Sequence, residues 1–166
     1  MYDFALNPDL PAEERYRELT QMALALTEGE EDPIANMANV AALISECVPK
    51  LNWAGFYRAT NGKSGPELVL GPFIGRPACI RIEWGAGVCG TAAASGATQR
   101  VEDVHAFPGH IACDAASRSE LVVPIFKDGA VIGVLDLDSP EPGRFAPQDA
   151  AGFEALVDAI SDRIAG

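Results

Sequence analysis

The sequence predicts a single α+β domain, α/β in the broad sense, in which helices from both chain ends pack on one face of a mainly antiparallel sheet. Three observations predict it. Apolar residues recur at helical spacing near each end, glycine-containing turns separate β-rich runs in the middle, and the chain has 166 residues. A chain of this length forms about one domain with a substantial core. We therefore expect residues 1–166 to fold as one unit, with loops on the uncovered face.

Two helices are predicted before the sheet. The first spans Ala12 to Thr27, where apolar residues recur three and four apart. The second follows Pro33 and ends at Pro49. Cys47 lies on the apolar stripe of the second helix, and we expect it to pack as a small core side chain, because free cysteine is among the most buried residue types.

Two hairpins and a last helix complete the regular elements. Strands are predicted at Trp53–Ala59 and Glu67–Leu70, with a turn rich in Gly and Ser between them. A clearer pair is Leu121–Phe126 with Ala130–Leu137, because Asp-Gly between β-rich runs is a strong hairpin signal. The last helix spans about Pro147 to Ile164, and a proline suits its first turn.

The stretch between the hairpins, residues 71–114, is rich in Gly and Pro. Short elements are predicted near Cys79–Ile82, Cys89–Ser95 and Gln99–Glu102. Loops held by a rigid sheet are where catalytic and binding groups concentrate. This stretch is therefore the expected functional region.

The charge balance excludes several classes of partner. Lys+Arg 12 against Asp+Glu 24 gives a net charge of −12, which repels nucleic acid and anionic membrane surfaces. No apolar run approaches the roughly 18 to 20 residues that span a bilayer. The N-terminus lacks a basic region followed by an apolar run, so the expected location is cytoplasmic. In a reducing compartment, a disulfide among the four cysteines would be catalytic rather than structural.

Cysteines and carboxylates in the loops indicate thiol redox chemistry. Cys113 lies among carboxylates just before a predicted strand, and Cys79 and Cys89 lie upstream in glycine-punctuated loops. Asp136 and Asp138 are two apart on a strand, so both point to one face. Clustered like charges raise the pKa of at least one member, which allows a neutral acid near pH 7.

Several blocks of the sequence resemble the free methionine-(R)-sulfoxide reductases, a family of single GAF domains that act on the free amino acid. The blocks are Asn-Trp-Ala-Gly-Phe-Tyr at 52–57, Gly-Pro-Phe-Ile-Gly-Arg-Pro-Ala-Cys at 71–79, Gly-Val-Cys-Gly-Thr-Ala at 87–92, Glu-Asp-Val-His-Ala-Phe-Pro-Gly-His-Ile-Ala-Cys-Asp at 102–114, and Gly-Val-Leu-Asp-Leu-Asp-Ser at 133–139. The resemblance covers a catalytic core of about residues 52–145. One departure is Ala86, where the family more often has a basic residue.

The resemblance implies a GAF-like fold and a function in oxidative stress, the thiol-dependent reduction of free L-methionine-(R)-sulfoxide to L-methionine. It assigns the nucleophile to Cys113, which would become a sulfenic acid. Cys79 would then form a disulfide with it, and thioredoxin or a similar dithiol would reopen that disulfide. Cys89 is an alternative resolving residue, a relay toward the reductant, or a packed residue at a helix start. No cofactor is implied.

The resemblance also places carboxylates near the sulfoxide oxygen. Glu120 and Asp138 are the expected pair that polarises the oxygen, with Asp136 in support. The alternative for Asp138 is that it only starts the turn before Pro140. Asp103 is expected to meet the substrate ammonium, since an acidic group favours that charge.

Aromatic residues are candidates for binding the substrate side chain. Trp53, Tyr57 and Phe73 could wall the methionine, because contacts of sulfur with aromatic rings are favourable, although core packing explains each nearly as well. Trp84 is a candidate for a lid or a subunit contact.

Other functions stay open at the level of sequence. A metal site that uses His105 and His110 is disfavoured, because the cysteines show no zinc-type spacing. A non-catalytic GAF sensor of a small ligand, or a redox sensor, is the alternative to an enzyme. A homodimer through the helices is plausible.

Overall fold

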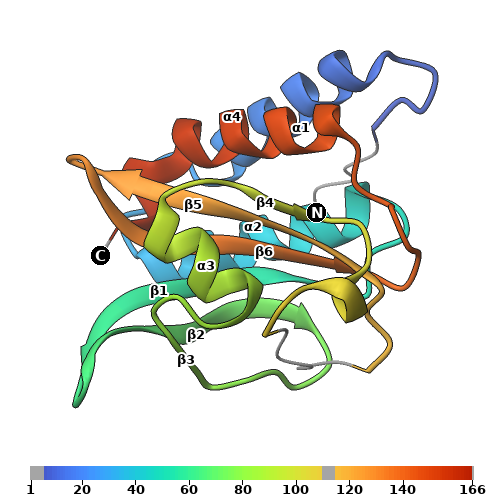
Figure 1. Ribbon diagram of the computed structural model, residues 1–166. Coiled ribbons are helices and arrows are strands. Elements are labelled where there is room, and N and C mark those ends of the chain that lie inside the picture. Colours follow the sequence, from blue (N-terminus) through green and yellow to red (C-terminus); the bar gives the residue numbers. More distant parts are fainter. Residues whose placement is uncertain (1–5, 110–114, 166) are drawn as a thin grey trace.

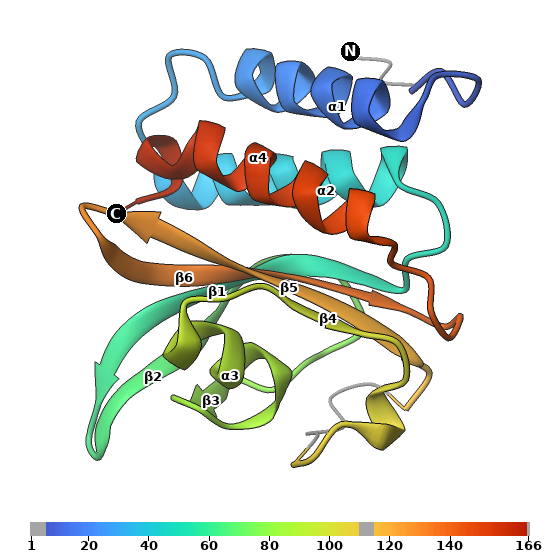
Figure 2. The same ribbon diagram turned by 45° about the horizontal axis from the view of Figure 1, so that its top comes forward.

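The computed structural model describes residues 6–109 and 115–165, and these form four layers. Figure 2 shows α1 (Ala12–Leu26) outermost, above α2 (Pro33–Cys47) and α4 (Pro147–Ile164), which lie on one face of the sheet. The short helix α3 (Gly87–Ser95) lies on the opposite face. Both terminal helices are thus on the predicted side, but α1 packs chiefly on α4 and α2 rather than on the strands.

The sheet has six antiparallel strands in the order β3-β2-β1-β6-β5-β4 (Figure 1). The strands are β1 (Trp53–Gly62), β2 (Gly65–Gly75), β3 (Arg81–Glu83), β4 (Gln99–Val101), β5 (Ser119–Lys127) and β6 (Ala130–Ser139). Both predicted hairpins, β1 with β2 and β5 with β6, are confirmed. β1 pairs with β6 at the centre of the sheet and so joins the two hairpins. The start of β1 therefore lies beside the end of β6 in the middle of the sheet.

The second strand is longer than predicted, because β2 continues through Gly71 and Pro72 to Gly75. The pairing of β2 with β1 is irregular between Gly55 and Tyr57, which is the part of β1 opposite Gly71 and Pro72. On its other side, β3 pairs only with Glu67 to Val69, so no neighbouring strand there needs the N–H that proline lacks. The strand therefore passes two residues that usually end strands.

Local signals set the helix bounds. Asp32 caps α2, since its carboxylate accepts hydrogen bonds from the backbone N–H groups of Ile34 and Ala35 at 2.8 and 3.0 Å. Pro33 and Pro147 occupy the first turns of α2 and α4. Among the described residues, no helix combines the length and apolar character needed to cross a membrane.

Two apolar clusters fill the two sides of the sheet. The larger lies between the strands and the layer of α2 and α4, and the half-buried Cys47 packs against it as predicted. The smaller lies between the sheet and α3, and it includes Trp53, Tyr57 and Cys89. Most of the predicted site residues lie on this second side.

Candidate active site

Strand register places the three predicted carboxylates on the α3 side of the sheet. Glu120 on β5 is directly opposite Asp138 on β6, and Asp136 lies two residues before Asp138 on the same face. On the other side of β6, Asp136 faces Gly55 and Asp138 faces Trp53. Asp138 lies within β6, which continues to Ser139, so the interpretation that it only starts a turn is wrong.

Helix α3 brings a thiol to these carboxylates. Cys89, in the first turn of α3, is buried, and its Sγ lies 3.9 Å from Oε1 of Glu120. One ligand atom each from Cys89, Glu120 and Asp136 lies within 4.8 Å of the others, and all three residues are buried. We call these three residues the acid cluster. Asp138, which was expected to pair with Glu120, lies at the partly exposed margin of this cluster.

Burial changes the protonation of every member of the acid cluster. Desolvation, followed by the charges of Asp136 and Asp138, raises the pKa of Glu120 well above its usual range. Desolvation raises the pKa of Asp136 to about 7. It also raises the pKa of the Cys89 thiol well above 9.0, with Asp136 and Glu120 adding to the effect. The cluster therefore holds protons at neutral pH, and Cys89 is a neutral thiol there.

The three ligand atoms of the acid cluster lie close enough together to hold either a bound cation or a shared proton. Carboxylate and thiolate bind a metal in their ionised forms. The raised pKa values of all three groups favour the protonated forms instead. We therefore interpret the acid cluster as a proton store.

An aromatic wall stands beside the carboxylates. The Trp53 ring stacks on Phe73 with centroids 5.1 Å apart and on Tyr57 with centroids 6.0 Å apart. Gly55 makes the stacking possible, because a Cβ there would lie 2.3 Å from Cβ of Phe73 and 2.8 Å from the Trp53 ring. The sequence reasoning missed Gly55, since a lone glycine in a strand has many explanations.

The same wall holds the segment that carries Cys79. The hydroxyl of Tyr57 donates to the carbonyl of Cys79 at 3.0 Å, and Nε1 of Trp53 donates to the carbonyl of Arg76 at 3.1 Å. Between the segment and the sheet lies a cavity of about 20 Å³, lined by Trp53, Tyr57, Arg76, Pro77, Ala78, Asp136 and Asp138. Its volume is close to that of one water molecule. The backbone around Arg76 was not predicted as part of the site.

The three cysteines within the described residues differ in state and place. Cys79 is half-buried and disulfide-bonded, whereas Cys47 and Cys89 are not disulfide-bonded. The predicted nucleophile Cys113 lies outside the described residues, as do His110 and Asp114. The sequence-based assignment of Cys113 therefore stays a prediction.

Asp103 caps the short 3-10 turn at Val104–Ala106, accepting a hydrogen bond from the N–H of His105 at 3.1 Å. Its other carboxylate oxygen lies 3.8 Å from the guanidinium of Arg118, which the sequence reasoning did not single out. A carboxylate that caps a turn and pairs with arginine already has protein partners, and its expected role toward the substrate ammonium stays a prediction.

The chain is similar to several known proteins. A family model described as a GAF domain matches residues 39–165. Protein YtsP of Bacillus subtilis is 51% identical over 153 residues, which are 92% of this chain and 93% of that protein. The free methionine-R-sulfoxide reductase of Escherichia coli is 50% identical over 144 residues, 87% of this chain and 85% of that protein.

A solved structure extends the match to three dimensions. The X-ray structure of free methionine-R-sulfoxide reductase from Neisseria meningitidis, in complex with its substrate, has a TM-score of 0.90 and 42% sequence identity. The match covers 99% of this chain and 96% of that one. Since the identities lie well above 30% over nearly the whole chain, and the fold and the sequence blocks agree, the chain belongs to the free methionine-R-sulfoxide reductase family of GAF-domain proteins.

Proposed function

We propose that this protein reduces free L-methionine-(R)-sulfoxide to L-methionine with electrons from thioredoxin. The observation that carries the proposal is the acid cluster, in which buried carboxyl groups keep protons at neutral pH beside the segment of Cys79. Sulfoxide reduction needs such a group, because the oxygen leaves only after it is protonated. The names of the relatives support the same activity.

In the first step, the thiolate of Cys113 attacks the sulfur of the sulfoxide, and Glu120 gives a proton to the oxygen. The S=O bond breaks, methionine leaves, and Cys113 becomes a sulfenic acid. Glu120 suits the donor role because burial keeps its carboxyl group protonated. Asp136 can restore that proton, since its ligand atom lies within 4.8 Å of that of Glu120.

In the second step, the thiol sulfur of Cys79 attacks the sulfenic sulfur of Cys113 and displaces hydroxide. The hydroxide takes up a proton and leaves as water. A disulfide remains, and a dithiol protein reduces it with two electrons and two protons. The disulfide-bonded state of Cys79 supports its role as the resolving residue. Cys89 suits that role less well, because its buried thiol stays neutral and faces Glu120.

The cavity of about 20 Å³ beside Asp136 and Asp138 is too small for a methionine side chain, so binding in that cavity requires the segment around Arg76 to move. Two hydrogen bonds from Trp53 and Tyr57 hold this segment, and reduction of the disulfide at Cys79 removes a covalent restraint on it. Once it moves, the indole of Trp53 becomes a wall for the methionine sulfur. Such a cycle suits a reducing compartment such as the cytoplasm.

The test is a coupled assay with thioredoxin, thioredoxin reductase and NADPH. Free L-methionine-(R)-sulfoxide, its (S) epimer and a peptide-bound sulfoxide are supplied separately. We expect NADPH consumption only with the free (R) epimer. If the folded, reduced protein consumes none of the three, a ligand or redox sensor becomes the better interpretation. Size-exclusion chromatography of the same preparation tests the predicted homodimer.

A further inference from the structure

The stretch of chain that carries Cys113 begins and ends at one point of the fold. The backbone N–H of Val104 donates a hydrogen bond to the carbonyl of Arg118 at 2.9 Å. An ion pair between Asp103 and Arg118 joins the same two ends. We call Asp103, Val104, Ser117 and Arg118 the neck of this stretch. Cys113 itself lies outside the described residues, five positions before Arg118 in the sequence.

Asn52 and β6 fasten the neck to the sheet. Nδ2 of Asn52 donates a hydrogen bond to Oγ of Ser117 at 3.0 Å, and the backbone N–H of Asn52 donates to the carbonyl of Asp138 at 3.0 Å. The N–H of Arg118 donates to the carbonyl of Ser139, the last residue of β6, at 2.7 Å. Asn52, which directly precedes β1, therefore contacts both the neck and the strand that carries two of the site carboxylates.

Buried hydroxyl groups are concentrated at this point. Of the seven buried polar or charged residues in the described chain, three are Ser117, Ser119 and Ser139. Burial of a hydroxyl group costs free energy unless the group is hydrogen-bonded, and a hydrogen bond fixes direction as well as distance. The Oγ of Ser119 donates to the carbonyl of Glu141 at 2.6 Å, and Ser117 accepts the bond from Asn52. Directional bonds in the interior therefore hold the neck.

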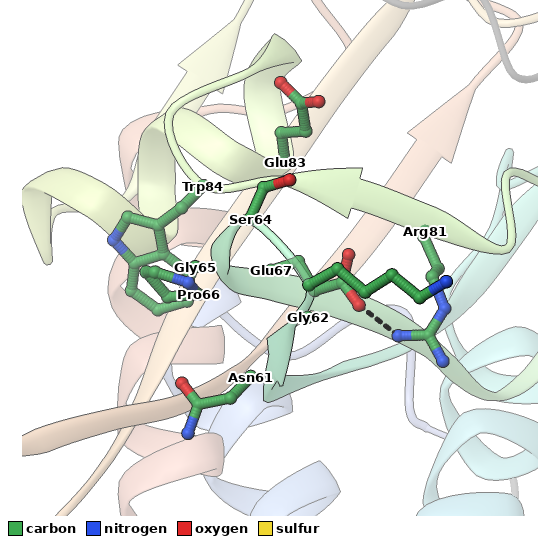
Figure 3. Close-up of a pocket in the computed structure, with 10 residues that line it drawn as sticks. Asn61, Gly62, Ser64, Gly65, Pro66, Glu67, Arg81, Glu83 and Trp84 are labelled. Carbon is green, nitrogen blue, oxygen red and sulfur yellow. Dashed lines mark hydrogen bonds and ion pairs between the residues drawn. The ribbon is translucent and has the colours of Figure 1, made fainter.

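The opposite end of β1 is held differently. Figure 3 shows Arg81, paired with Glu67, on one side of a depression of about 960 Å³ and Trp84 on another. The Arg81 side chain is exposed, and an exposed ion pair does little to fix geometry, because solvent screens it. No residue that lines this depression is among the buried polar residues of the described chain. Of the two ends of β1, the neck end is therefore the one whose polar contacts fix positions.

The neck leads directly into the acid cluster. Glu120 follows Ser117 by three residues and lies opposite Asp138 in the sheet. A misplacement of about 1 Å between reacting groups lowers a rate by about 100-fold. We propose that the hydrogen bond between Asn52 and Ser117 positions Cys113 relative to Glu120 for the first chemical step. Asn52 and Ser117 are positioning residues, since neither exchanges a proton or an electron with the substrate. This proposal rests on the proposed function, in which Cys113 is the nucleophile.

The experiment measures the first chemical step alone. Reduced protein is mixed with excess free L-methionine-(R)-sulfoxide without a reductant, and rapid quench follows the methionine formed in a single turnover. We expect Asn52→Ala and Ser117→Ala each to lower the rate constant at saturating sulfoxide about tenfold, and to keep the half-saturating concentration within about twofold of the wild type. Ser117→Thr keeps the hydroxyl group and should stay near the wild-type rate constant. The two alanine variants are independent, so if one does not fold, the other decides the result.

Coupling between the two residues separates positioning from general support of the fold. Because each substitution removes the same hydrogen bond, the double variant should be no slower than the slower single variant. Asn36→Ala is the matched control, because Asn36 is a buried asparagine whose Nδ2 donates to the carbonyls of Glu30 and Arg163 at 3.1 and 2.9 Å. It lies on α2, on the other face of the sheet, so this variant should lose stability in urea and keep the wild-type rate constant.

Three results would overturn the positioning role. They are wild-type rate constants in both single variants, losses that multiply in the double variant, and a loss in Asn36→Ala equal to that in Asn52→Ala. The proposed function fails differently, because the wild type then forms no methionine.

In that case the alkylation of Cys113 by iodoacetamide, measured on reduced protein by peptide mass spectrometry, reports on the neck without any sulfoxide. We expect Ser117→Ala to change the alkylation rate at Cys113 several-fold and to leave the rate at Cys47 unchanged, because Cys47 lies on the other side of the sheet. Equal rates at Cys113 in the variant and the wild type would also overturn the positioning role.

Discussion

The Sγ atom of Cys89 lies 3.9 Å from Oε1 of Glu120, although 31 residues separate them in the chain. The contact joins the first turn of α3 to β5 across the interior of the smaller apolar cluster. Neither group is exposed, and burial raises the pKa of both. The pair therefore stays protonated, so that the carboxyl group can donate a proton while the thiol acts as a neutral neighbour.

Replacement of Glu120 by glutamine should remove the proton donor. We expect Glu120→Gln to lower kcat for the free (R)-sulfoxide about 100-fold with little change in KM, because protonation matters most as the oxygen leaves. Steady-state kinetics with dithiothreitol measure both parameters. Glu102→Gln, at an exposed glutamate, is the control and should keep the wild-type kcat. An unchanged kcat in Glu120→Gln would exclude this residue as the acid.

Stability should fall with rising pH because Asp136 is buried. Its pKa is raised to about 7, against about 3.9 in the unfolded chain. Between these values the native state binds more protons than the unfolded state, so the free energy of unfolding decreases as pH rises, and the full penalty is present above about pH 7. Glu120 acts in the same direction.

Asp136→Asn should reduce this dependence. Between about pH 5 and pH 8, the fall in the free energy of unfolding should be smaller than in the wild type by roughly 2 kcal/mol. Urea unfolding of the disulfide form at both pH values measures it. Asp158→Asn, at an exposed position of α4, should follow the wild type. Equal slopes for all three proteins would contradict a buried, protonated Asp136.

Local sequence signals predicted the elements well, because each depends on near neighbours. The Asp128-Gly129 turn fixed one hairpin, and helical spacing fixed α1 and α4. The family resemblance is confirmed as well. The extension of β2 through Pro72 was missed, because it depends on β3 pairing with only part of that strand.

The depth of each carboxylate could not be predicted from sequence. Alternation along β6 puts Asp136 and Asp138 on one face, but their burial depends on distant neighbours. Asp136 lies between Gly55 and Val122 in the middle of the sheet, whereas Asp138 lies near the strand end. This is why Asp136, expected only to support the other two, lies inside the acid cluster.

The aromatic wall should depend on Gly55. In Gly55→Ala the new Cβ would collide with Cβ of Phe73 and with the Trp53 ring, so the variant should lose about 1 to 3 kcal/mol of stability and most of its sulfoxide turnover. Urea unfolding and the dithiothreitol assay measure the two effects. Gly129→Ala is the control, because its backbone φ is +80° but its surroundings are open. It should lose only about 1 kcal/mol and keep its activity.

The hydroxyl of Tyr57 should matter for resolution rather than for the first chemical step. Tyr57→Phe keeps the ring that stacks on Trp53 but removes the hydrogen bond to the carbonyl of Cys79. We expect single-turnover formation of methionine to stay near the wild-type rate, and formation of the disulfide to slow several-fold. Rapid-quench measurement of methionine and of free thiols separates the two steps. A slower first step with normal disulfide formation would place Tyr57 at the substrate instead.

The three cysteines of the site should respond differently to replacement by serine. Cys113→Ser should abolish turnover, because the nucleophile is lost. Cys79→Ser should form about one methionine per protein and then stall, because the sulfenic acid is not resolved. Cys89→Ser should keep most of the turnover, because a buried thiol with a raised pKa supplies little thiolate.

Product counts per protein, with thioredoxin as the reductant, distinguish these outcomes. Cys47→Ser is the control for a cysteine that is not disulfide-bonded and lies on the other side of the sheet from the acid cluster. Full turnover in Cys79→Ser together with stalling in Cys89→Ser would transfer the resolving role to Cys89. That result would require α3 to open, because Cys89 is only 5% exposed and cannot meet a second sulfur while it packs against Glu120. Normal turnover in both single variants would mean that each cysteine can replace the other.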